Sequence, residues 1–508
     1  MKRSITIVGG GAAAVSLLYC YLQQSDQHKD ADLPRVVYLF EGRHPFGTGS
    51  AYDVDCATNL LNTKAGFVTP FHDKPGAFYQ WLHANKDAWH KLYGELPFDE
   101  QTYLPRALFG LYLRDCLEDL VRQAADRQIE VVRIGAQVTR AIRSKHGYIL
   151  HAGFGLRLNT DYVFLCCGTL PAKIPARLLA TSGFVPSPYP VTSLTRKIAK
   201  SASVGVVGSR LSCIDTVIGL IEQGHTGKIV VHSRSGYFPC VRGTQGRIQP
   251  QLLSSESLNS LPSTSLVALI DLFTAEVAMQ GGKPFVFSST RAPDDLKAFL
   301  RKEIELAASD RVWQAVLYST NTTIEKIWSN LDEEAKTEVM DHHFSAFMAY
   351  RVSIPVENAK KILSFLETGQ LDFLAGNFDI AISDEGKLSV VGRESNSVKS
   401  DYDYVINATG SPRDVLQIDS QLIESLLQQD IAAPHRHGGI KVDINNYQVI
   451  GRDGQADSHL YALGELTNGV FFFTSALEII ARHARLCVTR FVEQQSSFSD
   501  TSAAIYAA

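Results

Sequence analysis

The sequence predicts an α/β protein with two units of the same plan and a mostly helical insertion. An apolar strand, a glycine turn and an apolar helix open the chain, and the same order returns near residue 203. Between the two halves, the stretch 251–365 reads as mostly helical. One plan that occurs twice in a chain is better evidence for an architecture than either copy alone.

The first fifteen residues have the pattern of a dinucleotide-binding turn. The run Ser4–Val8 is short and mostly β-branched, and three glycines separate it from an apolar helical stretch. In that context Gly9 permits a tight turn, Gly11 lets the backbone approach a pyrophosphate, and Ala14 lets the helix lie close to the strand. The unpaired N–H groups and positive end of the helix then face the phosphates.

An acidic residue completes this pattern. The run Arg35–Phe40 reads as a second strand that ends at Glu41, where a carboxylate accepts hydrogen bonds from a ribose diol and repels a 2′-phosphate. The spacing from Gly11 to Glu41 is longer than the usual ~20 residues. The polar stretch Gln23–Asp32, read as a surface loop, accounts for the additional residues. Two plainer interpretations are a glycine turn without a ligand and a secretory leader, whose apolar core three glycines would break.

Composition limits the classes of protein to consider. The 508 residues suffice for roughly two to four domains. The net charge is −4 without a basic tract, and no apolar run reaches the length of a membrane helix, so we expect neither nucleic acid nor a membrane as a partner. The eight cysteines include no C-x-x-C pair, which suits buried thiols in the cytoplasm. His342 and His343 lack companions at ligand spacing, so we expect no metal.

The stretch Gly42–Pro70 has little regular periodicity. A structureless stretch of this length in a compact protein is usually functional, although a decorated surface loop is the alternative. Its glycines would let the backbone approach a ligand, and its polar side chains offer hydrogen bonds. These residues are Gly47, Gly49, Asn59, Asn62, Thr63 and Gly66.

The rest of the first half reads as one long helix and a run of strands. The helix Ala107–Ala124 has apolar residues spaced for one buried face. The last strand is followed by Gly168 and, three residues later, by a proline. This pattern indicates that the chain leaves the sheet there. The expected strands are Glu130–Ile134, Gln137–Ile142, Tyr148–Ala152 and Tyr162–Cys166.

The pattern then restarts. Its segments are the strand Ser203–Val207, a turn with Gly208, Ser209 and Arg210, the helix Cys213–Gln223 and the strand Lys228–His232. The second strand is followed by Ser-Arg, with Arg234, and not by an acid. Later strands are expected over Leu371–Ile380, Leu388–Val391 and Tyr404–Ala408, and the insertion is expected to hold the helices Leu266–Met279, Asp294–Ala308, Asp310–Leu317, Glu333–Tyr350 and Val356–Leu366.

Near the C-terminus, a strand reaches the glycine-acid turn Gly464-Glu465. The helix Thr474–Val488 begins beside that turn, and its dipole would stabilise negative charge on a bound ring or phosphate. The alternative is a closing strand and helix that only complete the first sheet.

These residues resemble the two-dinucleotide-binding flavoproteins, the group that holds glutathione reductase and the class B flavin monooxygenases. The chain is most similar there to a bacterial family of FAD/NAD(P)-binding proteins, which is similar to the N-hydroxylating amino-acid monooxygenases. The G-x-G-x-x-A and NLLN stretches are the more specific matches. The matching stretches are IVGGGAAAVSLL, GTGSAY, NLLNTKAG, YLPRALFGLYL, VVGSRLSCIDTVIGL, VVHSRSGYFP, FMAYRVSIP and YALGEL.

The resemblance implies FAD on the first unit, with its pyrophosphate at the turn Gly9–Ala14 and its adenosine ribose at Glu41. It also implies that Asn62 runs near the isoalloxazine ring or the substrate. Gly464 and Glu465 would lie near the ribityl chain or the pyrophosphate, where an aspartate is commoner in this group.

The resemblance further implies NAD(P)H on the second unit, at Gly208, Ser209 and Arg210. Arg234 favours NADPH, because a guanidinium pairs with a 2′-phosphate in a planar fork. The family pattern has glycine where this chain has Arg210. A side chain there would either block the pyrophosphate or swing out and contact the phosphates itself.

The expected domains follow from this assignment. Residues 1–195 and 401–508 would form the FAD-binding domain, and residues 196–400 the NAD(P)-binding domain, with the insertion at about 251–365. The chain would then be an FAD-dependent, NADPH-reduced monooxygenase of a small molecule, with N-hydroxylation of an amine or amino acid as one such reaction. Alternatives are an FAD-linked oxidase or dehydrogenase with a degenerate nicotinamide site, and a non-catalytic flavin-binding redox sensor. No acid–base pair or nucleophile stands out, because the flavin itself carries such chemistry.

Overall fold

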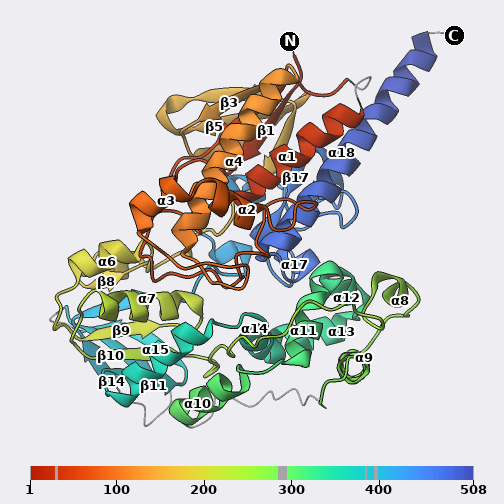
Figure 1. The fold of residues 1–508 in the computed structure, drawn as a ribbon. Coiled ribbons are helices and arrows are strands. Elements are labelled where there is room, and N and C mark those ends of the chain that lie inside the picture. Colours follow the sequence, from red (N-terminus) through yellow and green to blue (C-terminus); the bar gives the residue numbers. More distant parts are fainter. Residues whose placement is uncertain (1, 29–31, 284–294, 384–385, 394–398, 507–508) are drawn as a thin grey trace. The chain divides into compact units, whose positions relative to one another are not determined.

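The computed structural model of the chain describes residues 2–28, 32–283, 295–383, 386–393 and 399–506 (Figure 1). Parallel sheets and helices are both present, which confirms the predicted α/β class. The chain folds as two compact units, and each unit contains a parallel sheet of its own.

Each unit is assembled from segments that lie far apart in the sequence. Unit 1 comprises Met1–Val54, Thr63–Ala172 and Ser411–Ala508, and unit 2 comprises Asp55–Asn62 and Lys173–Gly410. The chain therefore returns twice to unit 1 after leaving it.

The chain passes from unit 1 to unit 2 after residue 172 and returns to unit 1 after residue 410. These boundaries differ from the expected residues 195 and 400. The reason is that β8 (Phe184–Val185) and β15 (Tyr404–Asn407) both belong to the sheet of unit 2. Parallel pairing satisfies the backbone N–H and C=O groups of both strands. β8 pairs with β15, and β15 pairs with β9 (Val204–Val207).

Unit 1 is built around a six-stranded sheet. Its strands are β1 (Ser4–Val8), β2 (Val36–Phe40), β3 (Glu130–Ile134), β7 (Tyr162–Leu165), β16 (Gln448–Ile450) and β17 (Ala456–Ala462). They lie in the order β16-β17-β7-β1-β2-β3, and only the edge pair β16–β17 is antiparallel. Val8 lies opposite Leu165, and Leu165 lies opposite Ala462, so three strands end at one edge of the sheet.

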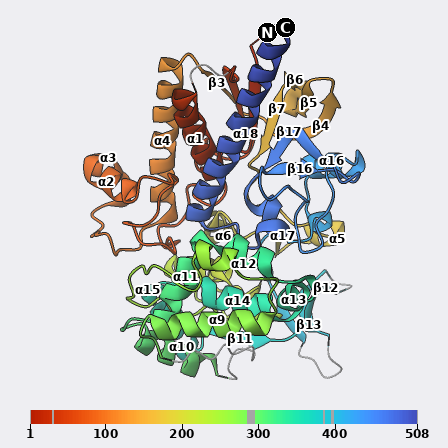
Figure 2. The same cartoon turned by 90° about the vertical axis from the view of Figure 1, so that its right-hand side faces the viewer.

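Three long helices accompany this sheet: α1 (Ala12–Gln27), α4 (Arg106–Asp126) and α18 (Leu477–Tyr506). α1 packs against both α4 and α18 (Figure 2). Its residues Ala12–Leu22 are small or apolar apart from Ser16, and nearly all are buried, so it forms the centre of the core of unit 1. The shorter helices are α2 (Ala77–Ala84), α3 (Lys86–Tyr93), α16 (Gln421–Gln428) and α17 (Asn468–Phe471).

An antiparallel meander follows β3 in unit 1. It consists of β4 (Val138–Ser144), β5 (Gly147–Ala152) and β6 (Arg157–Thr160). The sequence did not predict β6, because RLNT has no apolar alternation and its pairing with β5 alone makes it a strand.

Unit 2 is built around a five-stranded parallel sheet. Besides β8 and β15, it contains β9 (Val204–Val207), β10 (Ile229–Ser233) and β11 (Leu371–Ala375). The order is β11-β10-β9-β15-β8. The helices around it are α5 (Ala176–Leu179), α6 (Val191–Lys197), α7 (Leu211–Glu222) and α15 (Val356–Glu367).

The predicted internal repetition is confirmed. In each unit a strand, a glycine turn and a helix lead to two further strands, then to an antiparallel meander, and then to a strand beside the first. In unit 2 the meander is β12 (Phe378–Ile382), β13 (Leu388–Gly392) and β14 (Lys399–Tyr402).

One expected strand is wrong. Leu371–Ile380 is not continuous but forms the end of the sheet, β11, and the start of the meander, β12. Gly376 separates them with a φ of +154°, a conformation that suits glycine. The apolar residues on both sides of this turn made two strands look like one.

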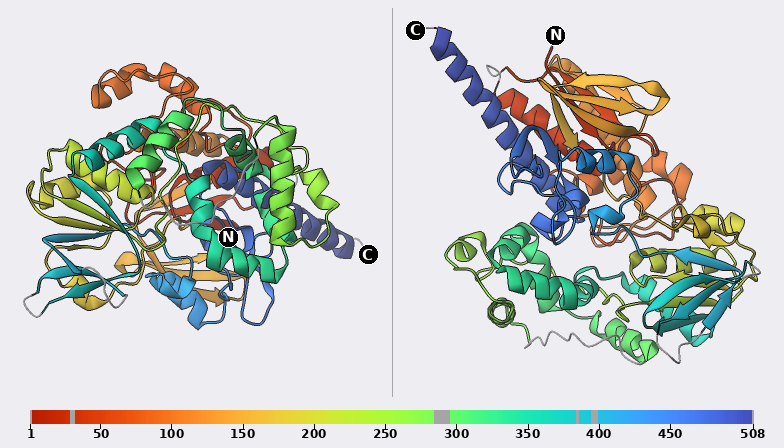
Figure 3. Two further views of the ribbon diagram at one scale, coloured as in Figure 1. Left: turned by 90° about the horizontal axis from the view of Figure 1, so that it is seen from below. Right: turned by 180° about the vertical axis from the view of Figure 1, so that it is seen from behind.

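The insertion of unit 2 is helical, as predicted (Figure 3). The expected helix Glu333–Tyr350 is interrupted by a π-helical turn at Val339–His343, a feature that often marks functional sites. The start of the expected helix Asp294–Ala308 lies outside the described residues. The helices are α8 (Ser255–Asn259), α9 (Leu266–Met279), α10 (Leu296–Leu306), α11 (Val312–Ser319), α12 (Ile324–Asn330), α13 (Glu333–Glu338) and α14 (Phe344–Arg351).

Across the part of the chain that the structure describes, no helix combines the length and the apolar character that a membrane span needs.

Candidate cofactor sites

The carboxyl edge of the first sheet brings three turns of unit 1 together. They follow β1, β7 and β17, which are adjacent, parallel and end in register. Strand order reverses between β1 and β7, because β1 leads to β2 on one side while β7 lies on the other. Ligands of open α/β sheets bind at such a switch point, so this edge is the candidate site of unit 1.

Gly9 is required at this edge for steric reasons. Its φ is +106°, and a Cβ atom there would lie 2.2 Å from the carbonyl oxygen of Cys166. Its N–H donates to the carbonyl of Phe40 at 3.0 Å. The turn after β1 therefore lies directly against the end of β7, where only glycine fits.

Gly11 faces another part of the chain. A Cβ atom on Gly11 would lie 3.2 Å from Cα of Gly49, and the N–H of Gly47 donates to the carbonyl of Gly10 at 2.6 Å. Gly47 and Gly49 of the Gly42–Pro70 stretch therefore pack on the glycine turn. Ala14, at the start of α1, is 1% exposed, which fits its predicted role in close packing of helix and strand.

Glu41 ties the end of β2 to the glycine turn. One carboxylate oxygen accepts the N–H of Gly10 at 3.1 Å, and the other accepts those of Arg43 and His44 at 2.9 and 3.2 Å. A carboxylate has about four acceptor sites, so three bonds leave room for a ribose hydroxyl. The structural role of Glu41 was not predicted.

Gly464 and Glu465 follow β17 at the same edge. Gly464 has a φ of +74°, and a Cβ atom there would have no neighbour within 4 Å. Burial raises the pKa of Glu465, while the charge of Arg413 and a hydrogen bond with Asn468 act in the opposite direction. The acid is therefore held close to a guanidinium that the sequence analysis did not identify.

The corresponding edge of unit 2 repeats the steric arrangement. Val207 at the end of β9 lies opposite Asn407 at the end of β15. Gly208 has a φ of +118°, and a Cβ atom there would lie 2.5 Å from the carbonyl oxygen of Ala408. This is the relation that Gly9 has to Cys166 in unit 1.

Ser209 is turned into the protein. Its hydroxyl lies 2.8 Å from that of Ser233 and donates to the carbonyl of Tyr237 at 2.7 Å. It is 6% exposed. Ser209 therefore joins the turn after β9 to the turn after β10, and its backbone is the part that is left to meet a ligand.

Arg210 and Arg234 bring two positive charges to this edge. Burial lowers the pKa of Arg210, and the positive charge of Arg234 lowers it further. The guanidinium of Arg210 lies over the ring of Phe344 on α14, 5.6 Å from its centroid. Among the described residues neither arginine forms an ion pair. Two guanidiniums that repel each other without an acid to balance them favour a bound anion.

Asn62 belongs to unit 2, not to the unit with the glycine turn Gly9–Ala14. Its carbonyl accepts a hydrogen bond from Arg242 at 3.2 Å. The segment 55–62 is held there by Asp55, whose carboxylate accepts the N–H groups of Val191 and Thr192 at 2.9 Å each. The role of Asn62 at the isoalloxazine ring stays a prediction.

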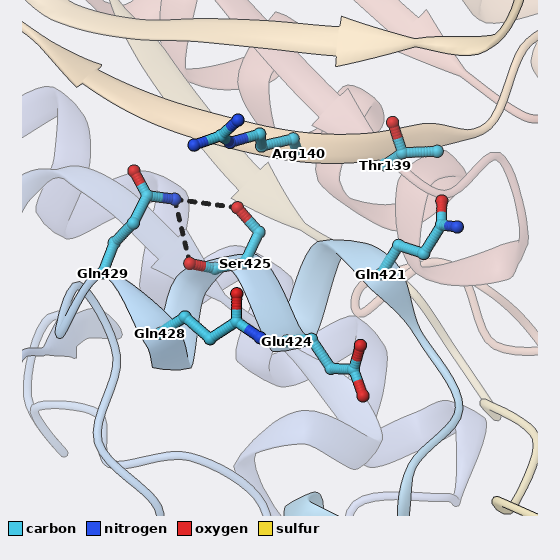
Figure 4. Close-up of a pocket in the computed structure, with 7 residues that line it drawn as sticks. All are labelled: Thr139, Arg140, Gln421, Glu424, Ser425, Gln428 and Gln429. Atoms are coloured by element: carbon cyan, nitrogen blue, oxygen red, sulfur yellow. Dashed lines mark hydrogen bonds between the residues drawn. The ribbon is translucent and has the colours of Figure 1, made fainter.

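A polar groove of about 400 Å³ lies elsewhere in unit 1, between β4 and α16 (Figure 4). It is at the meander and not at the carboxyl edge of the sheet, and no predicted site residue lines it, so we assign it no cofactor. Its lining residues are Thr139, Arg140, Gln421, Glu424, Ser425, Gln428 and Gln429.

The described residues contain no group of three His, Cys, Asp or Glu side chains that could hold a metal ion. All eight cysteines are free thiols.

Residues 6–170 match the model of a family described as FAD-NAD(P)-binding. Over 462 residues the chain is 23% identical to the uncharacterised protein YdhS of Escherichia coli (strain K12). The alignment covers 80% of this chain and 83% of YdhS. The family match includes the glycine turn and Glu41.

Solved structures of two ornithine hydroxylases and a cadaverine monooxygenase have the same fold. The ornithine N-hydroxylase of Kutzneria sp. 744 is 15% identical with a TM-score of 0.56, over 98% of this chain and 100% of that chain. The ornithine hydroxylase of Pseudomonas aeruginosa is 14% identical with a TM-score of 0.55, over 97% and 99%. The cadaverine monooxygenase of Erwinia amylovora is 13% identical with a TM-score of 0.52, over 97% and 94%. Residues 6–170 therefore match an FAD-NAD(P)-binding family, and nearly the whole chain has the fold of these solved structures.

Proposed function

We propose that this chain is an FAD-dependent oxidoreductase that NADPH reduces, and that it acts as a monooxygenase on a small molecule. The observation that carries the proposal is the charge at the matching ends of two strands. Glu41 directly follows β2 in unit 1, and Arg234 directly follows β10 in unit 2. A carboxylate suits a ribose diol and a guanidinium suits a 2′-phosphate, so the two edges fit two different dinucleotides.

FAD belongs on unit 1 in this proposal. The glycine turn and the N-terminus of α1 would hold its pyrophosphate, the remaining acceptor site of Glu41 its adenosine ribose, and the turn at Gly464 and Glu465 its ribityl chain. When bound, FAD supplies the electron-transfer and oxygen chemistry. The chain's own residues bind and orient it and exclude water, so no general acid or nucleophile is assigned.

NADPH belongs on unit 2. Arg234 would bind the 2′-phosphate, and Arg210 would leave the ring of Phe344 to bind the pyrophosphate. Arg210 has an extended backbone with a φ of −95°, so an arginine is accommodated there without left-handed strain. The substrate class that the relatives favour is an amine or amino acid, and the reaction is its N-hydroxylation.

A second candidate is favoured by one observation, the half-buried guanidinium of Arg210 where the family has glycine. If this side chain closes the edge to nicotinamide, the protein is an FAD-linked oxidase or dehydrogenase, or a flavin-binding redox sensor.

Anaerobic stopped-flow absorbance separates the two candidates. The protein is reconstituted with FAD and mixed with NADPH or NADH, then with oxygen in the presence and absence of amines. Rapid bleaching by NADPH, followed by a hydroxylated product, supports the monooxygenase. Bound flavin that neither nucleotide reduces would overturn it and favour the second candidate.

We also propose a cytoplasmic location, because the chain keeps eight free thiols. Burial raises the pKa values of Cys116 and Cys167 to about 12, so these thiols stay protonated and unreactive at neutral pH.

A further inference from the structure

The backbone is strained at Phe472, between α17 and α18. Phe472 has a φ of 63° and a ψ of −62°, and the N–H of Phe473 donates to the carbonyl of Phe471 at 2.8 Å. These values define a γ-turn with positive φ, which is rare and strained outside glycine. Phe472 is only 6% exposed. Strain of this kind persists only where the surroundings hold it, and it is concentrated at functional sites.

Arg413 is the residue that holds this turn. Its guanidinium donates to the carbonyls of Phe472 at 3.1 Å, of Asn468 at 2.7 Å, and of His437 at 3.2 and 3.3 Å. It also lies over the ring of Phe472, 5.9 Å from the centroid. One side chain therefore joins two segments of unit 1, the loop at His437 and the two ends of α17, which follows β17.

Thr474 lies two residues beyond the strained turn and just before α18. Its hydroxyl is buried without a hydrogen-bond partner among the described residues, and the side chain is 3% exposed. A buried hydroxyl without a partner is unfavourable in the free protein. A bound molecule that hydrogen-bonds to it would remove that penalty.

Phe472 and Thr474 belong to the chain that follows β17, and Arg413 connects this chain to the candidate site, because its charge acts on Glu465 after β17 while its guanidinium donates to Phe472 and Asn468. We propose that Thr474 contacts the bound flavin through its hydroxyl, and that Arg413 is a positioning residue that holds Thr474 in place through the strained turn at Phe472. This inference rests on the FAD site proposed for unit 1. It assigns a binding residue and its support, which the glycine and acid motifs did not include.

The first test compares Thr474→Val with Thr474→Ser. Valine keeps the shape and removes the hydroxyl, whereas serine keeps the hydroxyl. We expect Thr474→Val to raise the Kd for FAD about tenfold, measured by flavin fluorescence, and to shift the visible spectrum of the bound flavin. The Tm of the FAD-free protein should stay the same or rise, because an unsatisfied hydroxyl has gone. Thr474→Ser should bind FAD as the wild type does.

The second test compares Arg413→Met with Arg413→Lys and with the double variant Arg413→Met, Thr474→Val. If Arg413 acts through Thr474, the double variant should bind FAD no more weakly than the worse single variant. Arg413→Lys should restore part of the affinity and of the spectrum. Additive losses in the double variant would overturn the positioning role.

The outcomes separate this inference from the proposed function. Wild-type protein that binds no FAD would contradict the proposed function itself. Wild-type protein that binds FAD, together with a Thr474→Val variant of unchanged Kd and spectrum, would overturn only the role of Thr474. A Thr474→Val variant whose FAD-free form has a lower Tm and whose Kd is unchanged would assign the residue to stability alone.

Discussion

Single glycines at the two sheet edges decide how closely two strands' turns can approach. Gly9 and Gly208 have φ values of +106° and +118°, and each faces a carbonyl oxygen that a Cβ atom would overlap, at 2.2 Å and 2.5 Å. Sterics and backbone conformation therefore demand glycine at both positions. The strand–glycine–helix order predicted both glycines, but it did not predict the carbonyl oxygens that they face.

Gly9→Ala should destabilise unit 1 strongly. The new Cβ atom overlaps the carbonyl oxygen of Cys166 and has an unfavourable φ, so we expect a loss of about 2–4 kcal/mol in the free energy of unfolding. Urea denaturation measures it. Gly155→Ala is the matched control, because Gly155 has a φ of +72° and nothing within 4 Å of a Cβ atom, and it should cost about 1 kcal/mol. Equal losses at both positions would contradict the steric argument.

His232 should make unit 2 sensitive to acid. It lies on β10, is 1% exposed and is 2.8 Å from the hydroxyl of Tyr402. Burial lowers the pKa of His232 to about 4. Between pH 6.5 and 4 the unfolded chain binds a proton that the folded chain does not, so stability falls as the pH falls, by about 3 kcal/mol over this window.

The measurement is the free energy of unfolding by urea between pH 7 and 4, for the wild type and for His232→Gln. Glutamine keeps a polar group but does not titrate, so the variant should lose about 3 kcal/mol less over the same pH range. Parallel pH profiles for the two proteins would show that His232 is not the titrating group.

At the scale of elements, short polar segments were the least predictable. β6 and β14 have the sequences RLNT and KSDY, without apolar alternation, and become strands only because a neighbour pairs with them. Long apolar helices such as α9 were predicted to the residue, because their pattern is local. Pairing between distant segments is not encoded in local periodicity.

The N-terminus of α6 offers a test at this scale. Asp55 accepts the N–H groups of Val191 and Thr192 at 2.9 Å each and so joins the segment 55–62 to unit 2. Asp55→Ala should lower the free energy of unfolding by about 1–2 kcal/mol. It should also speed amide hydrogen exchange at the start of α6. Asp55→Asn should lose less, since an amide oxygen still accepts. Unchanged exchange in the alanine variant would exclude this capping role.

At the scale of the whole molecule, the parallel sheets of the two units share the same order of elements. They differ in the charge of the side chain directly after β2 and after β10. Glu41 follows β2 and Arg234 follows β10. The duplicated architecture gives the chain two dinucleotide edges, and the single residue after the strand is proposed to choose the cofactor.

Arg234→Ala should remove the preference for NADPH. Loss of a guanidinium–phosphate pair should raise the KM for NADPH roughly 10- to 100-fold and leave the KM for NADH almost unchanged. Steady-state or stopped-flow reduction with both nucleotides measures this. Arg393→Ala is the control, because Arg393 pairs with Asp379 on the meander of the same unit. An equal change for both nucleotides would refute the assignment of Arg234.

The sequence by itself determined the features that depend on local order. These are the two strand–glycine–helix units, most of the strands and helices, and the residues Gly9, Glu41, Gly208 and Arg234 at the sheet edges. Each is set by the spacing of neighbouring residues, which the sequence displays directly.

The tertiary structure alone decided which distant groups meet. Asn62 lies in unit 2 because Asp55 caps a helix more than a hundred residues away in sequence. Arg413 donates to carbonyls of two segments, at His437 and at both ends of α17, and the hydroxyl of Thr474 is buried without a partner among the described residues. Such contacts form between residues that are far apart in the sequence. Every residue has a backbone carbonyl, so the residue type does not reveal which carbonyl accepts such a hydrogen bond.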